Sequence, residues 1–315
     1  MLVSRRDCLG FVLILLWSEA ILGGDLTRLY GEEQSRIADF ALARMKSSRN
    51  LLNSGIFNAE GTLSIQGGVR DVDDKVTIFS AFDFRKRLLR CDRTGPMLVP
   101  ATLGNNRNPA VPARLVSQLV KTCYVSTPEG KLTSTSLDGS QVSFDEPGSK
   151  RNAMPYFDVR LVGLTSLDGV QHGHFDDLFP KLTEKLRPAL LSAQKESETI
   201  YRLEWRTHGG LAKRSLWIDE AHGFSPIRLE VRADPKLHVD QVYRVEWMQV
   251  SKVWVPKTFS CEEHSSAGRI EKCTLRFTWR SVNQAVDASL FYGKRSKLAA
   301  TPADVIDAQP AKPLR

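Results

Sequence analysis

Three short segments in the second half of the chain repeat one pattern of alternating large apolar and polar residues. They are Tyr201-Arg202-Leu203-Glu204-Trp205, Tyr243-Arg244-Val245-Glu246-Trp247 and Leu275-Arg276-Phe277-Thr278-Trp279. Successive side chains of an extended chain point to opposite faces, so each segment turns its apolar residues to one side and its polar residues to the other. The pattern predicts three strands that share one broad aromatic face. We expect this face to bind an apolar ligand through Tyr201, Leu203, Trp205, Tyr243, Val245, Trp247, Leu275, Phe277 and Trp279.

Three further apolar segments lie between these strands. They are Leu216 to Ile218, Ile227 to Val231 and Val253 to Val255, and residues typical of turns, such as Gly223 and Pro226, separate them. Strands joined by short turns pair with their neighbours in antiparallel fashion. The second half of the chain is therefore expected to form an antiparallel meander.

This half also resembles a known family. The run Trp217-Ile218-Asp219, followed by His222 to Glu230 and by Val253 to Lys257, is similar to bacterial envelope proteins related to the outer-membrane lipoprotein carrier, the LolA/LolB-like proteins. In those proteins a strand that ends in Asp leads through a Gly-Pro turn into the next strand, and a later strand carries a Trp-x-Pro motif. The run from Val282 to Phe291 is similar to the segment that closes the domain in many large members.

The resemblance implies an α+β fold, in which helices cover the concave side of a strongly curved antiparallel sheet, an unclosed barrel. It also implies an exported protein that binds a lipid, a lipoprotein acyl chain or another apolar ligand in the cell envelope without catalysis. A different class stays open, in which the same half-barrel is an interaction or sensing module for an envelope protein partner. In that case the protein's own helices fill the groove, and the aromatic face is ordinary core.

The first residues have the features of an export signal. Arg5 and Arg6 precede an apolar run from Leu9 to Trp17, and the small residues Gly23 and Gly24 follow. The apolar run is shorter than the roughly 20 residues that span a bilayer. We therefore expect a signal peptide over residues 1–24 that is cleaved near Gly23 or Gly24, and a periplasmic or secreted mature protein.

The export route stays open, because Ser4 to Leu9 resembles a twin-arginine signal but has Cys8 where an aromatic residue is usual. Residues 25–292 are expected to form one domain. Residues 293–315, rich in Ala, Pro and Lys and without periodicity, are expected to be disordered.

The net charge of +8 favours contact with anionic lipid headgroups over nucleic acid. Residues 1–24 contain two basic and two acidic residues, so their removal leaves the charge of the mature chain at +8. The basic residues alternate with acidic ones along the chain and form no long run, which is typical of a solvated, mixed surface. We expect peripheral membrane contact and no nucleic-acid partner.

Four cysteines follow the signal segment, an even number in a chain expected to be exported. Cys261 and Cys273 flank a predicted hairpin with its turn near Ala267, and this register places them opposite each other. We predict a disulfide between them, and a second one between Cys91 and Cys123. A zinc site built from all four is the alternative, although the chain lacks a close Cys-x-x-Cys pair.

The first half is predicted to begin with a helix from Asp25 to about Leu52. Its apolar stripe should cover the strand face described above, because no other large apolar surface is available. Strands, a long loop, a hairpin and a second helix should follow. The helical stripe comprises Leu29, Ile37, Phe40 and Met45. The later elements are strands over Phe57–Ile65, Lys75–Phe84 and Arg85–Cys91, a loop over Thr94–Pro112, a hairpin over Tyr124–Phe144 and a helical pattern over Phe175–Gln194, which Pro188 is expected to bend or end.

Catalytic motifs are few. The nearest approach to a metal site is His172-Gly173-His174, followed by Asp176 and Asp177, which would make the protein a metal-dependent hydrolase. The same residues also suit the start of a helix, where acidic side chains are favourable. No phosphate-binding glycine loop with Lys-Ser/Thr and no Gly-x-Ser-x-Gly motif is found in the sequence. We therefore expect no enzymatic activity, no metal and no cofactor.

Overall fold

The computed structural model describes residues 31–67, 71–100, 115–128, 130–136, 142–145, 158–164, 174–207, 211–233, 240–264 and 268–292. The predicted signal peptide, the predicted disordered tail, Leu29, His172 and the hairpin turn near Ala267 lie outside the described residues.

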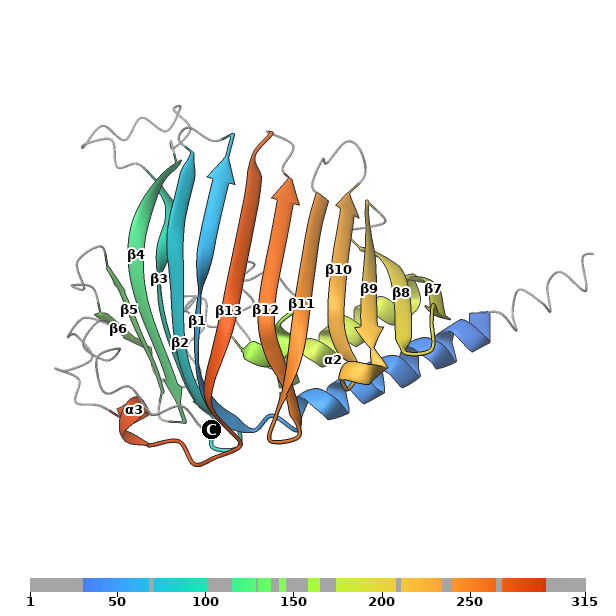
Figure 1. Cartoon of the computed structure of the whole chain (residues 1–315), viewed down its shortest axis with the longest axis horizontal. Helices are drawn as coiled ribbons and strands as arrows, with labels where there is room; N and C mark the ends of the chain where they lie inside the picture. Colours follow the sequence, from blue (N-terminus) through green and yellow to red (C-terminus); the bar gives the residue numbers. More distant parts are fainter. Residues whose placement is uncertain are drawn as a thin grey trace, which may run out of the picture.

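The described residues form one antiparallel sheet of thirteen strands (Figure 1). The three alternating segments all fall within strands of this sheet, β8 (Ile200–Thr207), β11 (Asp240–Val250) and β13 (Ile270–Val282). In chain order the strands are β1 (Ser54–Gln66), β2 (Val72–Asp83), β3 (Leu88–Pro100), β4 (Leu115–Thr127), β5 (Gly130–Ser136), β6 (Val142–Asp145), β7 (Leu190–Lys195), β8 (Ile200–Thr207), β9 (Ala212–Asp219), β10 (Ser225–Ala233), β11 (Asp240–Val250), β12 (Val253–His264) and β13 (Ile270–Val282).

The sheet consists of two meanders joined at one seam. Its strand order is β6-β5-β4-β3-β2-β1-β13-β12-β11-β10-β9-β8-β7, so β6 and β7 are its edges and β1 pairs with β13. Gly61 makes this seam possible, because a Cβ atom at that position would lie 1.7 Å from the carbonyl oxygen of Thr274. The sheet curves without closing (Figure 1), which confirms the predicted unclosed barrel.

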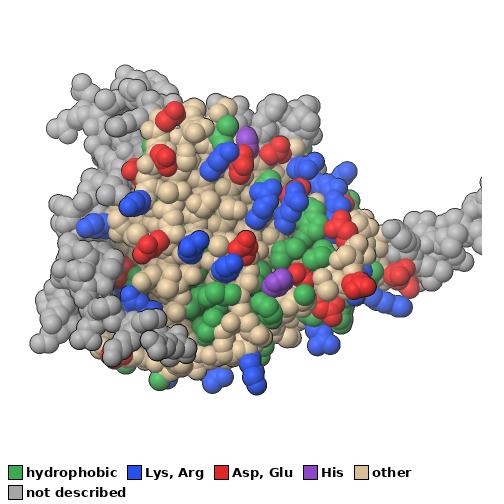
Figure 2. Space-filling model, in the orientation of Figure 1, with side chains coloured by type: hydrophobic (Ala, Val, Ile, Leu, Met, Phe, Trp, Pro, Cys, Tyr) green, Lys and Arg blue, Asp and Glu red, His purple; other side chains and the backbone are tan. Residues whose placement is uncertain are grey.

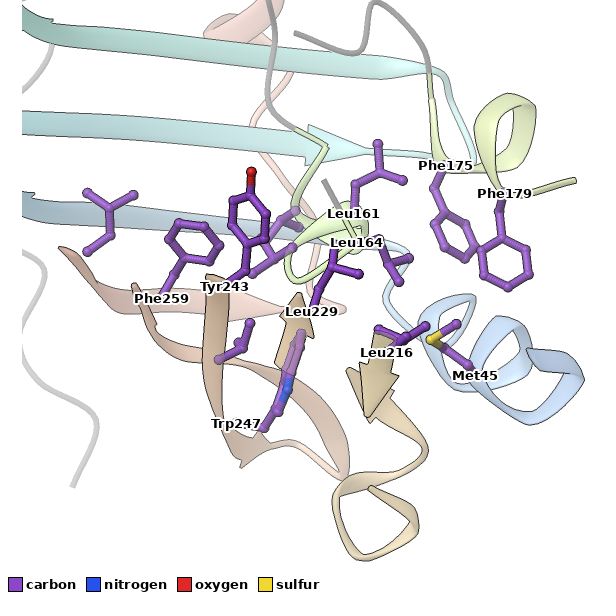
Figure 3. Packing of buried hydrophobic residues seen from close by; sticks show 14 of the residues in the cluster. Met45, Leu161, Leu164, Phe175, Phe179, Leu216, Leu229, Tyr243, Trp247 and Phe259 are labelled. Atoms are coloured by element: carbon purple, nitrogen blue, oxygen red, sulfur yellow. The ribbon is translucent and has the colours of Figure 1, made fainter. Parts of the chain in front are cut away.

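Helices and one short segment cover the concave face. A helix over residues 31–49 runs across one end of the strands, and α2 (Phe175–Leu186) lies behind the second meander (Figure 1). The segment 158–164, which contains the short 3-10 helix η1 (Val159–Leu161), lies next to the start of α2 (Figure 3). All three contribute to a single apolar core with the concave side chains of the sheet; their buried members include Ala41, Leu42, Met45, Val159, Leu161, Phe175 and Phe179.

The predicted role of the first helix as a cover is confirmed by the burial of Ala38, Ala41, Leu42 and Met45 in that core. Phe40, a member of the predicted stripe, is 43% exposed and lies at the border of the covered area. It contacts the rings of Tyr201 and Phe224 at centroid distances of 6.0 and 5.6 Å.

The convex face carries charges of both signs. Figure 2 shows basic and acidic side chains interspersed over it, with small apolar patches between them. Ion pairs between neighbouring strands are typical, such as Lys213 with Glu204 at 2.9 Å and Lys272 with Glu262 at 3.3 Å. At one corner the segment after β13, including α3 (Ser289–Tyr292), covers a smaller cluster that contains Phe79, Cys123 and Phe291.

Several predicted elements differ in extent from the structure. The helical pattern over Phe175–Gln194 was expected to bend or end at Pro188, and the helix ends at Leu186. Pro188 lies in the following 3-10 turn Arg187–Ala189, and Leu190–Lys195 forms the edge strand β7. The first residues of the predicted loop Thr94–Pro112 belong to β3, which continues to Pro100, and residues 101–112 lie outside the described residues. Among the described residues, no helix is long and apolar enough to cross a membrane.

Candidate functional site

The nine residues predicted to share a face do so. All belong to the concave core or pack against it, and each lies on β8, β11 or β13. The strand register arranges the concave side chains in rows that run across the sheet. One such row comprises Leu203, Leu216, Leu229, Tyr243, Cys261, Cys273 and Leu63.

One end of this face is packed beneath the first helix. The guanidinium of Arg49 lies 3.8 Å from the ring centroid of Trp247 and donates a hydrogen bond to Ser225 Oγ. The indole nitrogen of Trp247 donates to the carbonyl oxygen of Pro226 at 2.9 Å. Trp279 is held in a similar way, by a 3.0 Å hydrogen bond to the carbonyl oxygen of Pro256 and by the ring of Phe57 at 4.9 Å. These two tryptophans therefore belong to the core.

Gly223 allows this packing. It has a positive φ of 66°, and a Cβ atom there would lie 2.4 Å from Trp254 Cδ1 and 3.0 Å from Ser48 Oγ of the first helix. Only glycine fits such a position without strain or displacement.

Burial lowers the pKa of Arg49 to about 9, because the side chain is removed from water and gains no carboxylate partner among the described residues. Such a charge is costly to bury, and the aromatic face of Trp247 and the hydroxyl of Ser225 compensate it in part. Sequence reasoning missed Arg49, because a basic residue near the end of an amphipathic helix is ordinarily solvated.

The middle of the face is covered by the segment 158–164, and a buried ion pair fixes this segment. The carboxylate of Asp158 accepts hydrogen bonds from the backbone and side chain of Arg160 at 2.8–3.1 Å, and from the backbone N–H of Phe175 at 2.9 Å. It thus ties η1 to the first turn of α2. Figure 3 shows Leu161 and Leu164 between the strand residues Tyr243 and Leu229 and the α2 residue Phe175.

The far end of the face, away from the first helix, has a different character. There, Trp205, Arg214, Val231 and Gln241 stand in one row across β8 to β11. Trp205 is buried and its indole, unlike those of Trp247 and Trp279, makes no hydrogen bond in the part of the chain that the structure describes. Burial lowers the pKa of Arg214, with a weaker opposing influence from Tyr243.

The register of Cys261 and Cys273 is the predicted one. They are direct partners across β12 and β13, and both are free thiols in the structure. Their pairing as a disulfide in the exported protein stays a prediction. The predicted Cys91–Cys123 disulfide is wrong: Cys91 belongs to the concave core and Cys123 to the convex cluster, so their side chains point to opposite sides of the sheet.

The predicted alternative of a histidine metal site gains no support from the described residues. His174 is the N-cap of α2, and Asp176 forms an ion pair with Arg160 at 3.1 Å. His172 lies outside the described residues. Nowhere in the described ranges do three His, Cys, Asp or Glu side chains gather in a way that could hold a metal ion.

A polar cluster on the convex face surrounds Glu204. Burial alone would raise the pKa of this carboxyl, but hydrogen bonds from Lys213, Ser192 and Ser215 and the charge of Arg202 outweigh it and lower the pKa to about 2. Beside it, the ring of Trp217 lies between the guanidinium groups of Arg202 and Arg228 at 5.0 and 4.9 Å. Both guanidinium groups are paired with carboxylates of the sheet, Arg202 with Glu204 and Arg228 with Glu230, so we interpret the cluster as structural.

No protein-family model matches the chain, and no curated protein matches it. Several solved structures are similar. A DUF1329 family protein from Desulfovibrio piger has 12% identity and a TM-score of 0.42, over 82% of this chain and 98% of that one. A putative outer membrane lipoprotein-sorting protein domain from Vibrio parahaemolyticus has 14% identity and a TM-score of 0.40, over 85% and 99%. A LolA superfamily protein from Nitrosomonas europaea has 11% identity and a TM-score of 0.39, over 80% and 97%.

Proposed function

We propose that this protein binds an acyl chain or another apolar ligand against the concave face of its sheet, in the cell envelope and without catalysis. The observation that carries the proposal is the placement of all nine predicted residues on one inward face. An inward face of this kind gains free energy by removing a ligand from water, at roughly 0.8 kcal/mol for each buried methylene group. The predicted export signal and the family resemblance in the sequence support the location.

The two ends of the face suggest where the ligand lies. Ring contacts, a hydrogen bond and cation–π contacts join the cover to the sheet at the end of the strands near the first helix. Their partners there are Tyr201, Phe224, Ser225, Trp247 and Phe84. The row containing Trp205 and Arg214 is four residues along β8 from Tyr201, a distance of roughly 13 Å. We place the ligand at this second end.

A tryptophan pair tests that position. Binding of a long-chain fatty acid should change the intrinsic fluorescence of the wild-type protein in a saturable way. The change should be largely lost in Trp205→Phe, whereas the matched Trp279→Phe variant should retain it, because Trp279 is held in the packed end. Saturable binding with an equal change in both variants would place the ligand elsewhere.

A protein-interaction module is the second candidate, and the sheet edge favours it. Strand β7 is an edge of the sheet, and Leu191 on it is 43% exposed. Exposed strand edges are common sites of pairing with another chain. Native mass spectrometry of protein purified from the envelope separates the two candidates: a co-purifying lipid supports the carrier, and a stoichiometric protein partner without lipid supports the module.

A further inference from the structure

Arg214 occupies an inward position on the apolar face. Along β9 it points to the same face as Ala212, Leu216 and Ile218, which lie two, two and four residues away and are all buried in the concave core. Its neighbours in the same row are Trp205 on β8 and Val231 on β10. A guanidinium, which stays charged at every physiological pH, is thus placed among apolar side chains.

No carboxylate of the described residues compensates this charge. Along the same row the nearest acidic residue is Glu263 on β12, three strands away, or roughly 14 Å. Next in the row is Glu271, which already pairs with Arg269 at 2.6 Å. The acidic residues on the strands beside Arg214, Glu204 and Glu230, alternate with the concave residues and so belong to the opposite face.

Arg214 is half-buried, and two buried arginines of this protein show how a carboxylate compensates a guanidinium that is removed from water. Arg90 pairs with Asp92 at 2.7 Å, and Arg160 pairs with Asp158 at 2.8 Å. In both, the nearby carboxylates outweigh burial and raise the pKa. Burial lowers the pKa of Arg214, and its Nε has no hydrogen-bond partner. The difference is that no carboxylate among the described residues pairs with Arg214.

Arg49 also lacks a carboxylate among the described residues, but its surroundings differ. It is fully inside the packed end, where it stacks on Trp247 and donates to Ser225 Oγ. The first helix, to which it belongs, occupies the space above it. Arg214 has neither a stacking partner nor a hydrogen-bond acceptor in the part of the chain that the structure describes.

We infer that Arg214 binds the anionic head group, a carboxylate or a phosphate, of an amphipathic ligand whose acyl chain lies on the concave face. Guanidinium groups bind both anions through paired N–H donors, and such bonds are strong where water is excluded. The acyl chain would follow the adjacent row toward Leu229 and Tyr243, whose side chain points into the interior (Figure 3). This inference rests on the proposed function and adds the class of ligand to it.

The test compares ligands that share a chain and differ in the head group. Dodecanoic acid, monododecyl phosphate and 1-dodecanol would compete with Nile red, a neutral dye, on the full-length mature protein. Arg214→Met removes the charge and keeps the length of the side chain, and Arg214→Lys keeps the charge without the paired donors. Arg206→Met is the matched control, because Arg206 is an exposed residue of the neighbouring strand on the opposite face.

The wild-type protein and Arg206→Met should bind at least one of the two anionic ligands tenfold or more tightly than the alcohol. Arg214→Met should bind acid, phosphate and alcohol within about twofold of one another, and Arg214→Lys should keep an intermediate preference. The preferred anion identifies the head group as carboxylate or phosphate. Because the wild-type comparison needs no variant, a misfolded Arg214→Met would leave the test intact.

Equal affinity of the wild-type protein for acid, phosphate and alcohol would overturn the role of Arg214 and leave apolar ligand binding in place. A preference for anions that Arg214→Met retains would assign the head group to another cation. Failure of the protein to bind Nile red and all three ligands would instead refute the proposed function itself.

Discussion

The buried pair Asp158–Arg160 should be the most sensitive polar contact in the cover of the concave face. Asp158 is 2% exposed and its carboxylate accepts four hydrogen bonds, three from Arg160 and one from the backbone of Phe175. Asp158→Ala would leave the buried guanidinium with Asp176 as its remaining ion-pair partner among the described residues, and that carboxylate is 58% exposed. Breaking a buried pair in this way costs about 3–5 kcal/mol, a large part of the 5–15 kcal/mol by which domains are typically stable.

Urea unfolding, followed by tryptophan fluorescence, measures this cost. The matched control is Asp176→Ala, which removes the exposed partner of the same arginine and should lower the free energy of unfolding by about 1 kcal/mol or less. The double variant Asp158→Ala/Arg160→Met removes the unpaired charge as well, and it should recover about 2 kcal/mol or more relative to Asp158→Ala. If Asp158→Ala costs no more than Asp176→Ala, the pair does not anchor the cover and the reasoning is refuted.

Three further predictions concern the first helix, a turn and a carboxyl group. Ala41→Asp should lower the free energy of unfolding by several kcal/mol more than Phe40→Asp, because Ala41 is fully buried and Phe40 is 43% exposed; equal losses in urea unfolding would contradict this. Gly223→Ala should cost more than Gly268→Ala, which shares a positive φ but meets no atom within 4 Å, and similar thermal midpoints would show that backbone strain alone matters. The low pKa of Glu204 stabilises the fold above pH 4.5, and this contribution is lost as the pH falls toward 2, so Glu204→Gln should flatten the stability profile over that window; an unchanged profile would contradict the assignment.

Alternation alone predicted the strands and the face that they share. Each of the nine residues stands at an inward position, because side chains of a paired strand must alternate between the two faces whatever the fold around them. The same rule fixed the register of Cys261 and Cys273, since a short hairpin leaves little choice of pairing. For the first helix, the apolar stripe predicted a cover, and the burial of Met45 and Ala41 confirms it.

Tertiary structure decided which residues pack against each end of the concave face. Nothing local distinguishes Trp247, which packs beneath Arg49, from Trp205, because both end the same five-residue pattern. The segment 158–164 has no periodicity, and its position over the sheet depends on hydrogen bonds between Asp158 and Phe175, seventeen residues later. The pairing of β1 with β13 likewise joins residues more than 200 positions apart.

The inward position of Arg214 could be predicted from the sequence, but its lack of a carboxylate partner among the described residues could not. The sequence alone places a basic residue at an inward position of the run Ala212 to Ile218, and that break in the alternation was a readable signal. Whether a carboxylate lies close enough to pair with Arg214 depends on strands that are distant in sequence, because a sheet places the side chains of five or more strands in a single row. The sequence therefore determined the two faces of this protein, and the tertiary structure decided that Arg214 on the inner face has no carboxylate partner among the described residues.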